Sequence, residues 1–82
     1  NCFGDYYTRG GLDTRRREMI TLCFLAAQGG CEPQLTSHAV ANMRVGNDER
    51  FLIAVVSQCT PYIGYPRTLN ALRCIADAAA KA

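Results

Sequence analysis

The sequence has no tryptophan, three prolines and a single histidine, His38. With one histidine and no C-x-x-C or other metal-ligand spacing among the cysteines, we expect no zinc site. No stretch approaches the roughly 20 apolar residues of a membrane span, and no charged-apolar-small signal sequence opens the chain. The formal net charge is only +2, which does not indicate the strongly basic face that is typical of nucleic-acid binding. We therefore expect neither nucleic acid nor a membrane as a partner.

The short length predicts a single domain, residues 1–82, that does not stand alone. A chain of this size buries only about 60 to 65% of the surface that its unfolded form exposes. Because 49% of the residues are hydrophobic, some apolar surface is expected to meet other subunits of a homo-oligomer. The first residue is Asn1, and residues 1–8 include large apolar side chains, so we interpret the domain as trimmed at its N-terminus, where a signal would be hidden.

The number of cysteines is odd; the five are Cys2, Cys23, Cys31, Cys59 and Cys74. Cys23 and Cys74 stand among apolar residues at helical spacing, where a free cysteine behaves as a small hydrophobe. This usage predicts a reducing, cytoplasmic compartment, and we expect no disulfide.

The first half of the chain predicts two helices. The first begins near Asp13 or Thr14, which can cap it, and ends where Gly29 and Gly30 follow residue 28. Its apolar residues recur at offsets of 0, 3, 4 and 7, which predicts one buried stripe of Ile20, Cys23, Phe24 and Ala27. The second helix follows Pro33, ends at Gly46 and has a thin stripe of Leu35, Ala39 and Met43.

The second half predicts two more helices. Asn47 is a good cap for the third, whose residues 51–56 are apolar all round. We therefore expect it to be buried on several sides, as the central helix of the assembly. It is expected to stop near Thr60 or Tyr62, although Pro61 could instead kink it. The fourth begins around Pro66 and has one apolar side, formed by Leu72, Ile75, Ala76 and Ala79. No segment alternates with period two, so the predicted fold is all-α, a small antiparallel helical bundle.

Counting helix rise from the Gly29 turn predicts which reactive side chains lie together. Cys31, Cys59, Tyr62 and Arg67 are expected at one end of the bundle. His38 lies about 8 Å and Glu18 about 15 Å from that end. This difference argues against a direct Glu18–His38 contact within one chain, unless the helices cross steeply, water bridges the two, or a neighbouring subunit completes the pocket.

His38 is the leading candidate for chemistry, because histidine transfers protons near neutral pH. The alternative is that Gln34, His38 and Asn42, at i, i+4 and i+8, form a polar stripe facing solvent or another subunit. Glu18 is either a general acid/base or a surface partner of Arg15.

Arg67 lies in the first turn of its helix, where the helix dipole disfavours a cation. Such a charge suggests a partner. Arg67 is therefore either a clamp for a substrate carboxylate or one half of a structural ion pair.

Most of the chain, from GLDTRRREMITLCFLAAQGGCEPQLTSHAVANMRVG to the helix junction YIGYPRTLNAL, resembles the carboxymuconolactone decarboxylase-like family of the alkylhydroperoxidase D-like superfamily. The resemblance implies an oligomeric all-α fold, trimeric or hexameric, and matches Glu18 and His38 to the helix glutamate and pocket histidine of relatives. For the decarboxylase branch it implies chemistry without metal or organic cofactor. His38 would then be the proton donor, Glu18 its partner, and Arg67 a substrate anchor near Tyr62.

The cysteines bear on a second hypothesis, a thiol-dependent peroxide reductase with peroxiredoxin-like activity. Relatives in that branch carry C-x-x-C-x-x-x-H, but here Cys31 holds the first cysteine position and Gln34 replaces the second. Cys31 or Cys59 would be the reactive thiol, with Cys59 the candidate substitute for the missing partner of Cys31. A non-catalytic oligomer that binds a small ligand is the third hypothesis.

Overall fold

The structure, a computed structural model, describes residues 13–81 and contains four helices and no strand in that range. They are α2 (Thr14–Gln28), α3 (Glu32–Arg44), α4 (Glu49–Ile63) and α5 (Tyr65–Lys81). The predicted all-α class is confirmed. Residues 1–8, which include Cys2 and several large apolar side chains, lie outside the described part of the chain.

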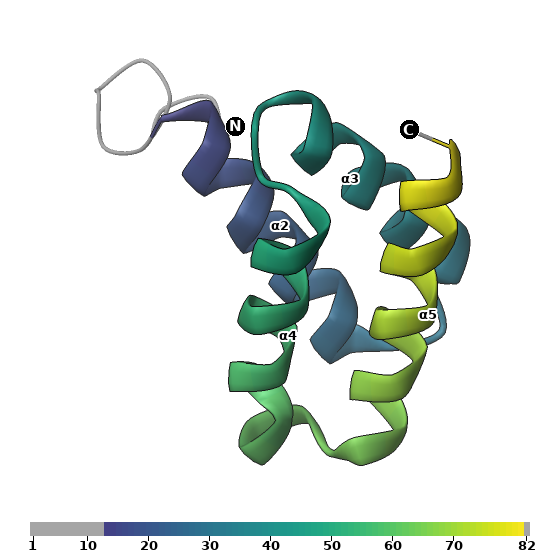
Figure 1. Ribbon diagram of the computed structural model, residues 1–82. Helices are drawn as coiled ribbons and strands as arrows, with labels where there is room; N and C mark the ends of the chain where they lie inside the picture. Colours follow the sequence, from purple (N-terminus) through teal and green to yellow (C-terminus); the bar gives the residue numbers. More distant parts are fainter. Residues whose placement is uncertain (1–12, 82) are drawn as a thin grey trace.

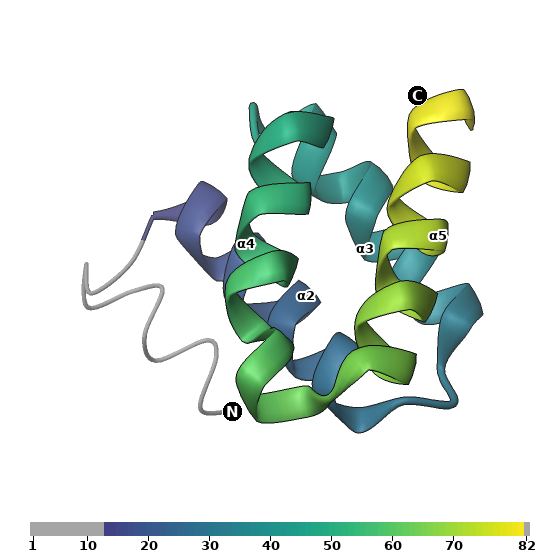
Figure 2. The same cartoon turned by 60° about the horizontal axis from the view of Figure 1, so that its bottom comes forward.

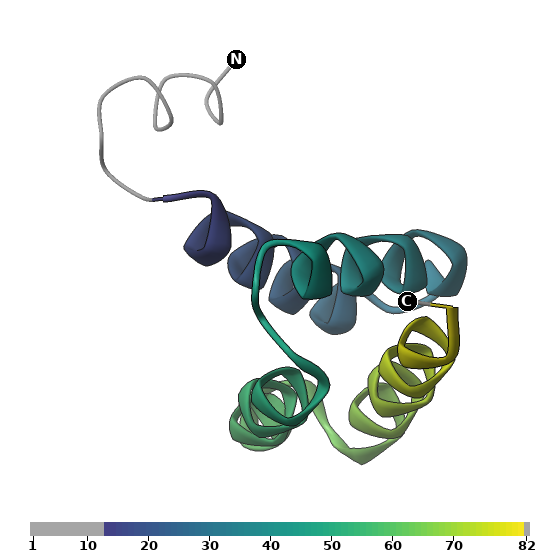
Figure 3. The same cartoon turned by 45° about the horizontal axis from the view of Figure 1, so that its top comes forward.

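The helices form two layers, with α2 and α3 over α4 and α5 (Figure 3). α4 and α5 lie side by side and run in opposite directions (Figures 1 and 2). α3 packs on α5, and α2 packs on both α3 and α4. No helix within residues 13–81 is long and apolar enough to cross a membrane.

Aspartates open two of the helices. The Asp13 carboxylate accepts a hydrogen bond from the Arg16 backbone N–H at 2.9 Å, which confirms one of the two predicted caps of α2. Asp48 caps α4 in the same way, through the Phe51 N–H at 2.9 Å. The prediction of Asn47 as that cap was therefore wrong. Asn47 is buried instead, at 3% exposure, because its amide pairs with buried polar groups.

Pro61 does not end its helix. α4 continues to Ile63 and ends at Gly64, whose φ of 86° supplies the left-handed conformation that terminates the helix. The predicted stop near residue 60 or 62 was thus slightly early. A proline in the last turn is tolerated because the helix is about to end and few later residues depend on its geometry.

The core consists of small and medium side chains from all four helices: Leu22, Ala26, Leu35, Ala39, Leu52, Val56, Ala71, Cys74, Ile75 and Ala78. The predicted buried stripe of α2 was wrong by about one residue, because Leu22 and Ala26 are buried while Phe24 is 62% exposed. The first helix lies against both α3 and α4, and the residues between those two neighbours are the ones that become covered.

The prediction that the third helix is buried on several sides does not hold within one chain. α4 buries only Leu52 and Val56, whereas Phe51 and Ile53 are 43% and 39% exposed. On α5, Ile75 is buried as predicted, but Ala76 is exposed and Ala78 takes its place in the core. With only four short helices, one chain supplies too few neighbours to cover a helix on every side.

Two buried asparagines tie three helices together. The Asn42 amide donates to the Glu18 carbonyl at 2.9 Å and to the His38 carbonyl at 2.8 Å. Its own oxygen accepts from the Asn47 amide at 2.9 Å, and Asn47 also donates to the Arg15 carbonyl at 2.8 Å. The chain of bonds connects α2, α3 and the start of α4, and it uses both N–H groups of each amide.

Replacing Asn42 by alanine should therefore destabilise the fold by about 2–4 kcal/mol, because it removes three hydrogen bonds and leaves the Asn47 amide and two carbonyls without their partner. Urea unfolding followed by circular dichroism measures the loss. Asn70→Ala, at an exposed position of α5, is the matched control and should change stability by less than about 0.5 kcal/mol. Equal effects of the two variants would contradict a special role for the buried network.

Candidate active site

Glu18 of α2 and His38 of α3 meet directly, with Glu18 Oε1 3.1 Å from His38 Nδ1. The rise count, which argued against this contact within one chain, was wrong. It compared backbone depths that differ by about 7 Å and assumed parallel axes. The tilt of α2 against α3 and the length of the glutamate side chain bridge that difference (Figure 1).

The pair is accessible to a small molecule. The His38 side chain is 41% exposed and that of Glu18 is 21% exposed. Arg15, the alternative partner of Glu18, instead donates to the Asn47 side-chain oxygen at 3.4 Å and to the Gly46 carbonyl at 3.2 Å. Glu18 is thus directed to the histidine while Arg15 is held by the α3–α4 connection.

Asn42 fixes the backbone under both members of the pair. The two carbonyls that its amide binds are those of Glu18 and His38 themselves. Asn42 is fully buried, so the predicted stripe of Gln34, His38 and Asn42 is not a uniformly solvated face. Asn42 therefore holds the backbone of both members of the pair in position. The sequence indicated its buried neighbour Asn47 only as a helix cap.

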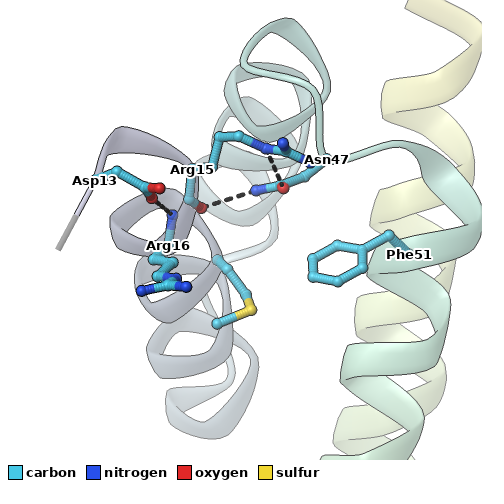
Figure 4. A pocket seen from close by; sticks show the side chains of 6 residues that line it. Asp13, Arg15, Arg16, Asn47 and Phe51 are labelled. Carbon is cyan, nitrogen blue, oxygen red and sulfur yellow. Dashed lines mark hydrogen bonds between the residues drawn. The ribbon is translucent and has the colours of Figure 1, made fainter.

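A small pocket of about 220 Å³ opens beside the first turn of α2, next to the pair along the helix (Figure 4). Figure 4 shows Arg15 reaching across to Asn47, with the Phe51 ring facing α2 from α4. The pocket is lined by Asp13, Arg15, Arg16, Met19, Asn47 and Phe51. Two guanidinium groups at its wall give it the chemistry to attract an anionic group.

Arg67 lies over the other end of α2. A Cβ atom added at Gly29 would come within 2.9 Å of Arg67 Nε, so the guanidinium stem packs closely on the glycine that ends the helix. The last turn of α2 has no basic residue of its own. Arg67 supplies a cation where the helix dipole is negative, which accounts for a charge that its own helix disfavours. Glu18 is about 16 Å away along α2, so one chain does not bring Arg67 to the Glu18–His38 pair.

The thiols have different hydrogen-bond partners. The Cys31 thiol donates to the Leu25 carbonyl at 3.2 Å, and Cys74 is buried. Cys59 lies with its sulfur 3.9 Å from that of Cys23, a pairing that the sequence analysis missed because nothing in the spacing of two residues 36 positions apart indicates it. Tyr62, near Cys59 in sequence, is 89% exposed. Within the described helices, no three histidine, cysteine or acidic side chains form a group that could hold a metal ion.

A family model described as the carboxymuconolactone decarboxylase family matches residues 1–77 of the chain. The match includes Glu18, His38, Arg67 and the five cysteines. No curated protein and no solved structure matches the chain significantly.

The place of Arg67 predicts a stabilising role. Arg67→Ala should lower the free energy of unfolding by about 0.5–1 kcal/mol in low salt and by less in 1 M salt, because salt screens a charge at a helix end. Thermal unfolding at the two salt concentrations measures this. Arg73→Ala, which removes an exposed cation from the middle of α5, is the control and should show a smaller change. A salt-independent loss would show that only side-chain packing was removed.

Proposed function

Because the chain belongs to the carboxymuconolactone decarboxylase family, we propose that it removes carbon dioxide from a carboxylated lactone or a related small acid, with the Glu18–His38 pair as its acid–base group and no cofactor. The observation that supports the proposal most directly is the 3.1 Å contact between the two side chains, which come from different helices. A positioned histidine and carboxylate are the groups that proton transfer needs.

We infer separate tasks for the two ring nitrogens of His38. The Glu18 carboxylate accepts the Nδ1–H, so it orients the ring and pairs with its positive charge when both ring nitrogens carry a proton. Nε2 is then the nitrogen that faces the reaction. When the bond to the substrate carboxylate breaks, carbon dioxide leaves and its bonding electrons stay on carbon as an enolate. The Nε2–H protonates that carbon, and solvent returns the proton to the exposed ring.

The substrate carboxylate needs a binding group. The pocket lined by Arg15 and Arg16 lies one turn of α2 before Glu18 and presents two cations. We propose that it receives the anionic end of the substrate. The substrate-binding roles of Arg67 and Tyr62 remain predictions. Binding of the substrate carboxylate by the pocket of one chain does not require either residue.

The main alternative is thiol-dependent reduction of a peroxide by Cys31 or Cys59. Gln34 stands where relatives have the second cysteine, and the Cys31 thiol proton is engaged by a backbone carbonyl. Both features disfavour chemistry at Cys31. A non-catalytic ligand-binding oligomer is the remaining alternative, and it predicts binding of the lactone without turnover.

The test is turnover of a carboxylated lactone, measured as release of carbon dioxide. His38→Ala should reduce kcat by about 10² to 10⁴, the range typical for loss of one acid–base group, and Glu18→Gln should also reduce it by removing the carboxylate that orients the ring. The fold should persist, because His38 is half-exposed.

Two matched variants complete the test. Gln34→Ala changes an exposed polar residue one turn before His38 and should leave kcat unchanged. Under the proposed function, Cys31→Ser should leave decarboxylation intact. If the thiol alternative with Cys31 is correct, the same variant should lose peroxide consumption. Retained lactone turnover in both His38→Ala and Glu18→Gln would refute the proposed site.

We further propose that the functional unit is a homo-oligomer, with a trimer or hexamer expected from the family. Support comes from large apolar side chains that the single chain leaves exposed: Phe24, Phe51, Ile53, Tyr62, Tyr65 and Leu69. Leaving so many on a small surface is unfavourable in water, and a second copy can cover them.

Light scattering at micromolar concentration should accordingly give a mass several times 9.0 kDa. Phe24→Glu, which places a charge on one of these exposed positions, should shift the mass towards that of the single chain. A stable monomer of the unaltered protein would contradict the proposed assembly.

A further inference from the structure

Cys23 of α2 and Cys59 of α4 form a thiol pair that the proposed decarboxylation does not use. Their sulfurs are 3.9 Å apart, although 36 positions separate the residues in sequence. A disulfide requires about 2.05 Å, so the sulfurs need to approach by roughly 1.9 Å. Both side chains are partly exposed, unlike that of Cys74, so a small reagent can reach them.

We propose that this pair is a redox-modification site, at which a hydroperoxide joins Cys23 to Cys59 in a reversible disulfide linking α2 to α4. In the first step the Cys59 thiolate attacks one peroxide oxygen, the O–O bond breaks, and Cys59 becomes a sulfenic acid. In the second step Cys23 attacks that sulfur and displaces water. With hydrogen peroxide, two thiols lose two hydrogens and two electrons in total, and the peroxide becomes two molecules of water.

The surroundings of the pair assign the two roles. Burial, the charge of Cys59 and the hydrogen bond between the two sulfurs together raise the pKa of Cys23 to about 12, and burial is the largest of these causes. Cys23 therefore keeps its proton at neutral pH. Attack on a peroxide requires a thiolate, so Cys59 is the thiol that reacts first and Cys23 is the one that resolves the sulfenic acid.

The cross-link would act on the helix that carries the candidate site. Glu18 lies five positions before Cys23 on α2, and a bond to α4 fixes that helix against the second layer. It also closes a loop of more than 30 residues, which restricts the unfolded chain. We expect the oxidised protein to unfold about 10 °C or more above the reduced protein.

The experiment treats the whole chain with one equivalent of hydrogen peroxide, blocks the remaining thiols with iodoacetamide and digests the protein with chymotrypsin. Cleavage after Phe24 separates Cys23 from Cys31, so the partner of each is identified. Mass spectrometry should find the Cys23 and Cys59 peptides joined, with the loss of two hydrogens, and dithiothreitol should separate them. The same sample should show the higher unfolding temperature before reduction.

Variants distinguish this site from the other thiols and from the proposed decarboxylation. Cys23→Ser and Cys59→Ser should each abolish the cross-link and the temperature shift, with Cys23→Ala and Cys59→Ala as second substitutions if a serine variant fails to fold. Cys31→Ser and Glu18→Gln should leave both unchanged, so a failed lactone assay does not affect this result. A Cys31–Cys59 peptide, or thiols that oxidise without joining, would overturn the proposal.

Discussion

The buried amides of Asn42 and Asn47 are the constraint on which the helix arrangement depends. Burying a primary amide is unfavourable unless its hydrogen bonds are made, so these side chains accept only the arrangement that supplies their partners. The partners are backbone carbonyls of α2 and α3, together with the amides themselves. Apolar contacts alone would tolerate small shifts of α2 along its neighbours. The amides do not, and they thereby set the distance between Glu18 and His38.

Helix α2 is the element that the chemistry shares. One side presents Glu18 to α3, another presents Cys23 to α4, and its final glycine lies under Arg67 of α5. Three different contacts therefore restrain the helix: a glutamate–histidine pair, a thiol pair and a cation at its negative end. A change in how α2 sits against the second layer is therefore expected to reach the acid–base pair, which connects the proposed redox modification to the proposed activity.

The core explains why so much apolar surface stays outside. Four of its members are alanines, Ala26, Ala39, Ala71 and Ala78, which let the helices approach closely but bury little area each. Several large side chains of α2, α4 and α5 remain exposed outside this compact interior. A single chain is thus stabilised by close helix contact and a few polar anchors, and the proposed assembly is what would bury the remaining aromatic and aliphatic surface.

Local chemistry let the sequence alone determine the all-α class, the approximate ends of each helix and Glu18 and His38 as candidates, because capping residues, glycines and apolar spacing act over a few positions. The resemblance of the chain also indicated its family. Only the tertiary structure decided that Glu18 touches His38, that Asn47 is a buried anchor and that Cys59 pairs with Cys23. Each of these depends on the tilt and rotation of one helix against another, and those are fixed by all the packed faces together rather than by any one segment.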